Sequence, residues 1–165
     1  MGDALEIGTF VENAVGASAS ASLLLPAILF LVAIFLAFST GTSWGTFAIL
    51  VPIATAMFPG TDKLEMMIIS VSAVLAGAVC GDHVSPISDT TVMSSAGAQS
   101  NHINHVTTQM QYAAVVAVVC FIGYTIAGVS QSWWIALGSS LVILLVGLTV
   151  MKRMVSSREK KSVAA

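Results

Sequence analysis

The chain has 165 residues, of which 56% are hydrophobic and only 8% are charged. A soluble domain of this length would carry charged faces, and here they are almost absent, so we predict an all-α, polytopic membrane protein embedded in the lipid bilayer. The formal net charge is −2 and no basic stripe exists, which argues against a nucleic-acid partner. Cys80 and Cys120 fall in apolar segments and are interpreted as small core residues rather than a disulfide or metal pair.

The first third of the chain predicts an interrupted helix. Residues 1–22 are polar and then rich in Ser and Ala, and their acidic start differs from the positive region of a signal peptide. Residues 23–38 form an apolar run, residues 39–46 are rich in hydroxyls and glycine, and residues 47–58 resume as a short apolar helix. This order predicts a discontinuous helix or a re-entrant hairpin.

The same plan recurs further along the chain. Residues 64–80 are apolar, and residues 81–91 (GDHVSPISDTT) form a break that contains two carboxylates and a histidine. A short helix of small residues follows, to about Gly97. An ionisable group at membrane depth is costly and by default marks an ion or proton pathway, so the second break is the prime functional candidate.

Two more conventional spans, residues 112–128 and 134–151, are joined by a turn with the interfacial pair Trp133 and Trp134. The tail from residue 152 holds five of the six basic residues, so the positive-inside rule predicts that it is cytoplasmic. We therefore divide the chain into a lead-in (1–22), a transmembrane transporter domain (23–151) and a basic tail (152–165).

The predicted cytoplasmic location of the tail orients the remaining segments. The turn at Trp133 falls outside, the polar segment 99–111 falls inside as a loop or surface helix, and residues 64–98 cross as one broken helix. Residues 23–58 either form a hairpin that enters from outside or span once, and we favour the hairpin. His102 and His105, three residues apart on one helix face, are interpreted as a cytoplasmic surface pair that senses pH rather than a metal site.

Oxygen atoms dominate both breaks, and desolvated alkali cations prefer oxygen ligands. The first break offers hydroxyls from Ser39, Thr40, Thr42, Ser43 and Thr46; the second offers Ser85, Ser88, Thr90 and Thr91 with the carboxylates of Asp82 and Asp89. Burial disfavours the charged form of a carboxylate, so a proton and a cation compete for it. That competition is the minimum chemistry of a cation/proton antiporter.

Structural roles stay open for the same residues. Hydroxyls in membrane helices commonly bond to backbone, and Asp82 or Asp89 can instead cap a helix N-terminus. His83 either relays protons or satisfies a buried backbone group, and Trp44 either gates the first break or packs. The sequence also contains glycines that we expect to permit unwound backbone, namely Gly41, Gly45 and Gly81.

The strings GTSWGT (41–46), GDHVSPISDTT (81–91) and SSAGAQSNHINHV (94–106) resemble the C-terminal part of the NhaC-type sodium/proton antiporter family, within the ion transporter superfamily. The resemblance covers residues 30–115. It implies a secondary antiporter of a bacterial-type cell membrane, with inverted repeats and hairpins that meet near the membrane midplane. On this analogy Asp82, His83, Ser85, Ser88, Asp89 and Thr90 line the ion site from one side and Thr42 and Ser43 from the other, with Asp82, Asp89, Ser88 and Thr42 as Na⁺ ligands.

Members of that family are considerably longer, and the resemblance places this chain as one half of an inverted-repeat transporter. The missing N-terminal half or a second copy of the chain is then the expected partner. We expect Na⁺ and H⁺ as transported ions, no cofactor and no enzymatic activity. Two alternatives stay open: a sodium- or proton-coupled exchanger of organic anions such as malate or lactate, and an inactive fragment or assembly partner.

Overall fold

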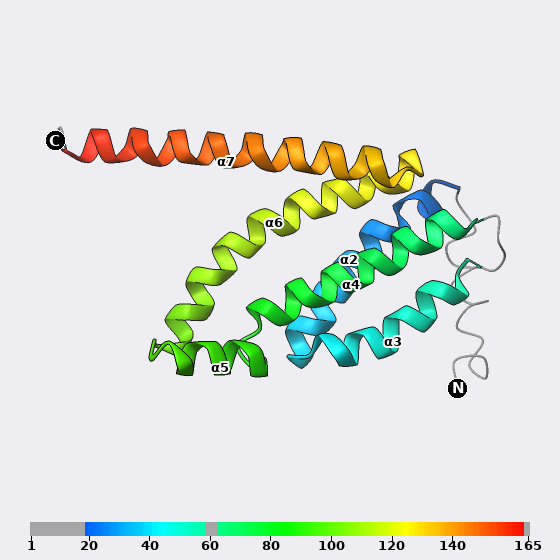
Figure 1. Ribbon diagram of the computed structural model, residues 1–165, viewed down its shortest axis with the longest axis horizontal. Coiled ribbons are helices and arrows are strands. Elements are labelled where there is room, and N and C mark those ends of the chain that lie inside the picture. The colour runs from blue at the N-terminus through cyan, green and yellow to red at the C-terminus, as the bar shows by residue number, and fades with distance from the viewer. Residues whose placement is uncertain (1–18, 59–62, 164–165) are drawn as a thin grey trace.

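The computed structural model describes residues 19–58 and 63–163, so most of the predicted lead-in lies outside the described residues. The described part is almost entirely helical and contains no strand, which confirms the all-α prediction. Its six helices are α2 (Ala19–Thr40), α3 (Ser43–Ala56), α4 (Leu64–Val84), α5 (Asp89–Gly97), α6 (His102–Ser130) and α7 (Trp133–Val163) (Figure 1).

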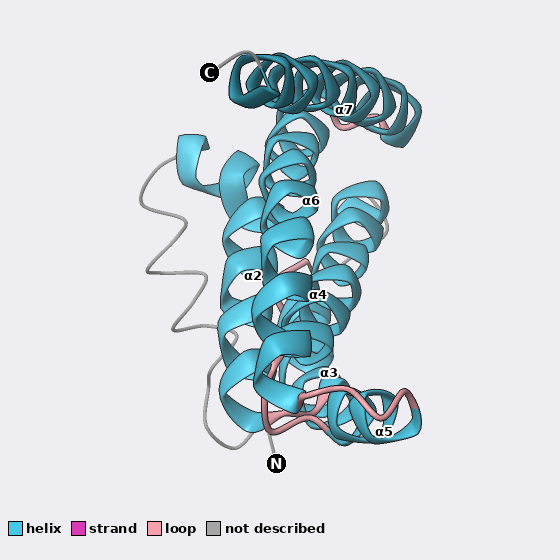
Figure 2. Ribbon diagram, turned by 90° about the vertical axis from the view of Figure 1, so that its left-hand side faces the viewer, coloured by secondary structure: helices cyan, strands magenta, loops and turns pink. Residues whose placement is uncertain are grey.

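The helices pack side by side, some parallel and some antiparallel to one another. α2 and α4 lie side by side and run the same way, whereas α3 and α6 run back in the opposite direction (Figure 1). Residues 19–56 therefore form a helical hairpin, with its turn between α2 and α3. Figure 2 shows α2, α4 and α6 next to one another, with α5 at the lower end and α7 packed on α6 at the upper end.

Two glycines bring α2 and α4 together. Gly77 and Gly81 lie one turn apart on α4, and a Cβ added to them would stand 2.4 Å from the Phe30 carbonyl oxygen and 2.2 Å from the Ile34 carbonyl oxygen. Small residues four apart let membrane helices approach this closely. Gly81 was expected to permit unwound backbone. In the structure Gly81 is part of α4, and its lack of a side chain allows α2 to pack closely against the helix.

The apolar core lies between α2, α3 and α4. Its buried members are Leu29, Ala33, Ala37, Leu50, Ala54, Val74 and Ala78. A second cluster, at the end of the layer where α2 begins, contains Leu25, Met57, Phe58 and Met66. These contacts bury the faces that the three helices turn toward one another, so the α2–α3 hairpin and α4 form one packed unit.

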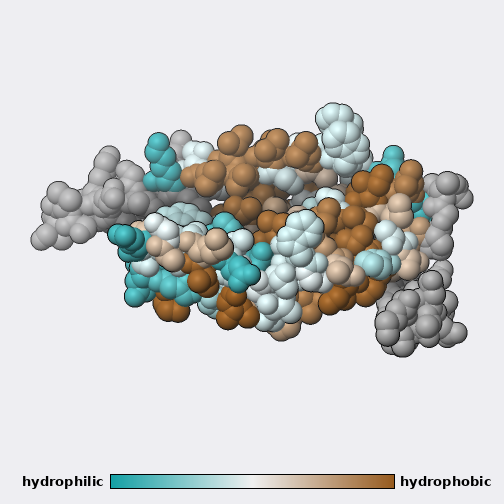
Figure 3. Space-filling view, turned by 60° about the horizontal axis from the view of Figure 1, so that its bottom comes forward, coloured by the Kyte–Doolittle hydropathy of each residue, from teal (hydrophilic) through white to brown (hydrophobic). Residues whose placement is uncertain are grey.

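Within residues 19–58 and 63–163, three helical segments are long and apolar enough to cross a membrane: Leu23–Thr40, Leu64–Val84 and His102–Ser130. Ser43–Ala56 and Trp133–Thr149 are shorter apolar helices. The space-filling view shows apolar surface over the middle and right of the molecule, with hydrophilic surface on the left, where α5 and the start of α6 lie (Figure 3). Length, composition and surface together describe a polytopic membrane protein.

Both interruptions are shorter than the sequence indicated. The chain is non-helical between α2 and α3 only at residues 41–42, and between α4 and α5 only at residues 85–88; we call these the first linker and the second linker. Hydroxyl side chains next to the linkers need no break in the helix for a hydrogen bond: Thr40 Oγ1 donates to the Leu36 carbonyl at 2.8 Å and Thr46 Oγ1 to the Thr42 carbonyl at 3.0 Å.

Three further features concern α5, α6 and α7. α5 turns aside from the axis of α4 (Figure 1). α6 begins at His102, so most of the polar segment 99–111 is helical. α7 continues to Val163 through most of the basic tail. The polar residues in these segments lower the helix propensity only slightly. Once a helix has nucleated, adding further residues to it is favourable.

Candidate functional site

The two linkers touch each other. A Cβ added to Gly41 would stand 2.8 Å from Ile87 Cγ1 and 2.9 Å from the Ile87 carbonyl oxygen. Gly41 also has a positive φ of 67°, a conformation that other residues rarely adopt. The fully buried Ser85 donates its hydroxyl to the Phe38 carbonyl at 2.7 Å, which satisfies one of the open carbonyls at the end of α2. The structure thus brings together the two breaks that the sequence singled out.

Because the linkers touch, four helix ends meet in one place. α2 and α4 contribute their C-terminal ends, which carry partial negative charge and carbonyls without helical partners. α3 and α5 contribute their N-terminal ends, which carry partial positive charge. A site of this kind offers carbonyl oxygens to a cation and amide groups to an anion. It lies at the shared end of α2 and α4, not halfway along them (Figure 1).

Thr42 and Ser43 hold the start of α3. Thr42 is the N-cap residue, and its Oγ1 accepts from the Gly45 amide at 3.4 Å. Ser43 is the first residue of the helix, and Gly45 is helical and not unwound. The Thr42 hydroxyl oxygen therefore has a structural task at the site, and its second lone pair stays available to a ligand.

The second linker is tied down by hydroxyl contacts. Ser88, the N-cap residue of α5, is 1% exposed and its Oγ lies 2.8 Å from Thr90 Oγ1. Thr91 Oγ1 donates to the His83 carbonyl at 3.2 Å and so connects α5 to the end of α4. Asp89 is exposed in the first turn of α5, where the helix dipole favours a carboxylate. Ser88 occupies the N-cap position without a capping bond from its side chain, and Asp89 supports the helix start from the next position.

Asp82 is the least satisfied group of the site. It lies in the last turn of α4 and not in unwound backbone, and it is half-buried. Its Oδ1 atom is buried and has no hydrogen-bond partner among the described residues. A carboxylate at a helix C-terminus also faces the unfavourable end of the dipole. Neither packing nor capping accounts for an acidic residue in this position.

His83, the neighbour of Asp82, faces α6. Its Nε2 faces the Gln109 amide nitrogen of α6, while Gln109 Oε1 is buried without a partner among the described residues. Turning the amide end over places Oε1 on the ring N–H and satisfies both groups. His83 and Gln109 line a cavity of about 450 Å³ between α2, α4 and α6, together with Phe30, Cys80, Tyr112 and Cys120. Sequence reasoning missed Gln109, because nothing local distinguishes it from the other polar residues near the start of α6.

His102 and His105 do not form a solvent-facing pair. His102 is half-buried and contacts Ser95 of α5, and His105 lies 3.3 Å from the Ser94 hydroxyl through its Nε2 atom. Both imidazoles therefore join α6 to α5. Within the ranges that the structure describes, no group of three or more His, Cys, Asp or Glu residues is arranged to hold a metal ion.

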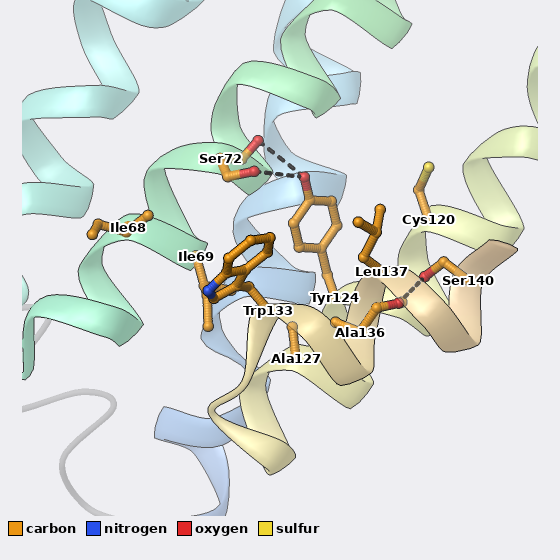
Figure 4. A pocket seen from close by; sticks show the side chains of 11 residues that line it. Ile68, Ile69, Ser72, Cys120, Tyr124, Ala127, Trp133, Ala136, Leu137 and Ser140 are labelled. Carbon is orange, nitrogen blue, oxygen red and sulfur yellow. Dashed lines mark hydrogen bonds between the residues drawn. The ribbon is translucent and has the colours of Figure 1, made fainter.

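A second cavity, of about 420 Å³, lies between α4, α6 and α7 and is mostly apolar (Figure 4). Its polar feature is the Tyr124 hydroxyl, 3.1 Å from both the hydroxyl and the carbonyl oxygen of Ser72. The Tyr124 ring also packs on Phe30 of α2, with ring centroids 5.3 Å apart. Tyr124 thus ties three helices together, and the cavity is separate from the linkers.

The tryptophans lie on the surface. Trp44 is 80% exposed and makes an edge contact with Phe47, so it neither covers the first linker nor packs inside the described part. Trp133 and Trp134 stack at the start of α7, with centroids 3.7 Å apart. Their exposure beside a turn is typical of residues at a membrane interface.

The fold and the touching linkers define a class: helical membrane proteins in which interrupted helices place their ends against each other. The Na⁺/H⁺ antiporter family matches residues 1–129, and the chain belongs to that family. The match includes all of α2 to α5 and nearly all of α6, so it reaches beyond the stretch that showed the resemblance in the sequence.

A protein of Haemophilus influenzae described as uncharacterized is 51% identical to the chain over 129 residues. The aligned region is 78% of this chain and 25% of that protein, so the chain spans about a quarter of the length of this relative. No solved structure matches the chain.

Proposed function

We propose that the chain forms part of an antiporter that exchanges Na⁺ for H⁺, and that the Asp82 carboxylate is the group that the two ions occupy in turn. Membership of the Na⁺/H⁺ antiporter family supports antiport. The observation that carries the proposal is the buried Asp82 Oδ1, which has no hydrogen-bond partner among the described residues.

A carboxylate oxygen that is buried without a hydrogen bond stabilises negative charge poorly, and the half-buried Asp82 has one such oxygen. Burial of this kind costs free energy unless a cation, a proton or hydrogen bonds compensate. At Asp82 the helix dipole adds to this cost. A bound proton or a bound Na⁺ relieves it, but both cannot occupy the same oxygen, and this exclusion couples the two ions.

Oxygen-bearing side chains of the two linkers and of the adjoining helix ends are suited to complete a Na⁺ shell. We propose Thr42, Ser88 and Asp89 as further ligands, with carbonyls from the ends of α2 and α4, while Ser43, Ser85, Thr90 and His83 shape the site. No Lys or Arg occurs between Lys63 and Lys152, so residues 64–151 lack the side chains that usually bind organic anions. We further propose that the remaining elements of the transporter face this site from another segment or subunit, in a cell membrane with the basic tail cytoplasmic.

Na⁺ binding and proton flux together test the proposal. The full chain, purified in detergent, is titrated with Na⁺ and followed by sodium NMR, and proteoliposomes with an internal pH dye report proton movement. Na⁺ binding should weaken as the pH falls, because protons and Na⁺ compete for the same oxygen. Asp82→Asn should weaken binding by about tenfold to a hundredfold, comparable to losing a contact to a charged group, and abolish its pH dependence.

Glu65→Gln is the matched control, because Glu65 is an exposed acidic residue in the first turn of the same helix. It should behave as the unsubstituted chain. Equal Na⁺ binding by the Asp82 and Glu65 variants, or the absence of both Na⁺ binding and flux in the unsubstituted chain, would contradict the proposed role.

A further inference from the structure

We propose that His102 is a positioning residue that holds the second linker in place, and that its protonation tightens this hold. The linker matters for transport only if the proposed function is correct. The contact itself is a property of the fold and can be tested without transport.

The His102 ring bridges three elements. As the first residue of α6, it places Nε2 at 2.8 Å from the Pro86 carbonyl oxygen in the second linker and Nδ1 at 2.9 Å from Ser95 Oγ in α5. A carbonyl only accepts, so Nε2 carries a proton and donates to Pro86. Ser95 is 2% exposed, so water does not replace its contact.

The second linker is thus held from two sides. Ser85 binds the end of α2 through the Phe38 carbonyl, and Pro86 is bound by His102 from α6. Ile87, between these contacts and the start of α5, packs against Gly41 of the first linker. The imidazole of His102 therefore supports the backbone on which the two touching linkers depend.

Protonation changes the hydrogen bonds of Ser95. With neutral His102, the Ser95 hydroxyl proton points either to Nδ1 or to the Val92 carbonyl, 2.9 Å away, but not to both. With a charged imidazole, Nδ1–H donates to Ser95 Oγ and the hydroxyl donates to Val92, so every group is satisfied. The bond to Pro86 also becomes charge-assisted, and such bonds are shorter and stronger.

Other titratable groups lie at this end of the fold. They are Asp82 and His83 at the end of α4, Asp89 at the start of α5 and His105 one turn along α6. His105 bonds to Ser94 and not to the linker. It shares the face and the surroundings of His102 without touching Pro86, which makes it the natural control for pH effects that arise elsewhere.

Hydrogen exchange of the full chain in lipid nanodiscs tests the proposal. Mass spectrometry follows the peptide spanning the second linker and α5, at about one pH unit below and about two above the ordinary histidine pKa of about 6.5, after correction for intrinsic exchange. The unsubstituted chain should be more protected at the lower pH. His102→Asn, which is too short to reach Pro86, should exchange about three- to tenfold faster at the lower pH and lose the pH dependence.

His102→Gln separates positioning from charge. Its amide N–H reaches the position of Nε2, so it should keep the protection seen at high pH but show no pH dependence. His105→Asn loses only the contact to Ser94 and should keep the pH dependence of the unsubstituted chain. Protection of the peptide in His102→Asn equal to that in His105→Asn would overturn the proposal. So would a pH dependence that survives in both His102 variants. The protection of the peptide and its pH dependence are both measured without Na⁺ and without proton flux, so this inference and the proposed function can fail separately.

Discussion

At the residue scale, the contact between the linkers depends on a few atoms. Gly41 allows the sharp turn after α2 and leaves room for Ile87, and the Ser85 hydroxyl closes the end of α2. The sequence pointed to Gly41 correctly, because a glycine among hydroxyl residues is typical of a turn. It could not separate Gly41 from Gly45 and Gly81, because only the packed structure reveals which glycine has positive φ.

Gly41→Ala should lower the free energy of unfolding by about 1–2 kcal/mol for the left-handed conformation alone, with the clash against Ile87 adding to this. Gly97→Ala is the control, because Gly97 is helical and an added Cβ meets nothing within 4 Å. Unfolding of the purified chain by SDS, followed by circular dichroism, measures both. Equal midpoints for the two variants would show that the Gly41 turn is not under steric constraint.

At the element scale, the α2–α4 pair organises the fold. Hydropathy predicted both helices, but the residues that join them were not recognised as such, since Gly77 and Gly81 look like ordinary small residues in an apolar run. Linker boundaries were also misplaced for a local reason: Ser and Thr predict breaks by composition, yet Thr40 and Thr46 satisfy their own hydroxyls within the helices.

Gly77→Leu should separate α2 from α4, because even a Cβ at this position meets the Phe30 carbonyl. Overpacking of this kind typically costs about 1–3 kcal/mol. Gly147→Leu in α7, where a Cβ meets nothing within 4 Å, should be close to neutral. The same SDS titration compares them, and a Gly77 variant as stable as the Gly147 variant would contradict the close packing of α2 on α4.

At the scale of the whole molecule, the helix directions sort the turns into two groups. Both linkers and the α5–α6 turn lie at one end of the layer, and the α6–α7 turn lies at the other (Figure 1). α6 is a candidate span, so its ends should lie on opposite sides of the membrane. The basic tail then predicts that the linkers are at the cytoplasmic end.

Single cysteines test this topology in intact cells, after Cys80 and Cys120 have been replaced by Ala. Ser132→Cys, at the α6–α7 turn, should react with a membrane-impermeant maleimide from outside. Gly97→Cys, at the end of α5, should react only after the cells are permeabilised. Labelling of both positions from the same side would exclude α6 as a membrane-crossing helix in this orientation.

The sequence by itself determined the membrane environment, the all-helical class and the two polar segments that interrupt the helices, because hydropathy and rare charged residues are local properties that can be read in order. It also pointed to Asp82 as an acidic residue out of place. Only the tertiary structure decided that the two linkers touch, that Gly77 and Gly81 join α2 to α4, and that His102 reaches Pro86. These contacts join residues far apart in the chain or on different elements, so they exist only once the helices have packed.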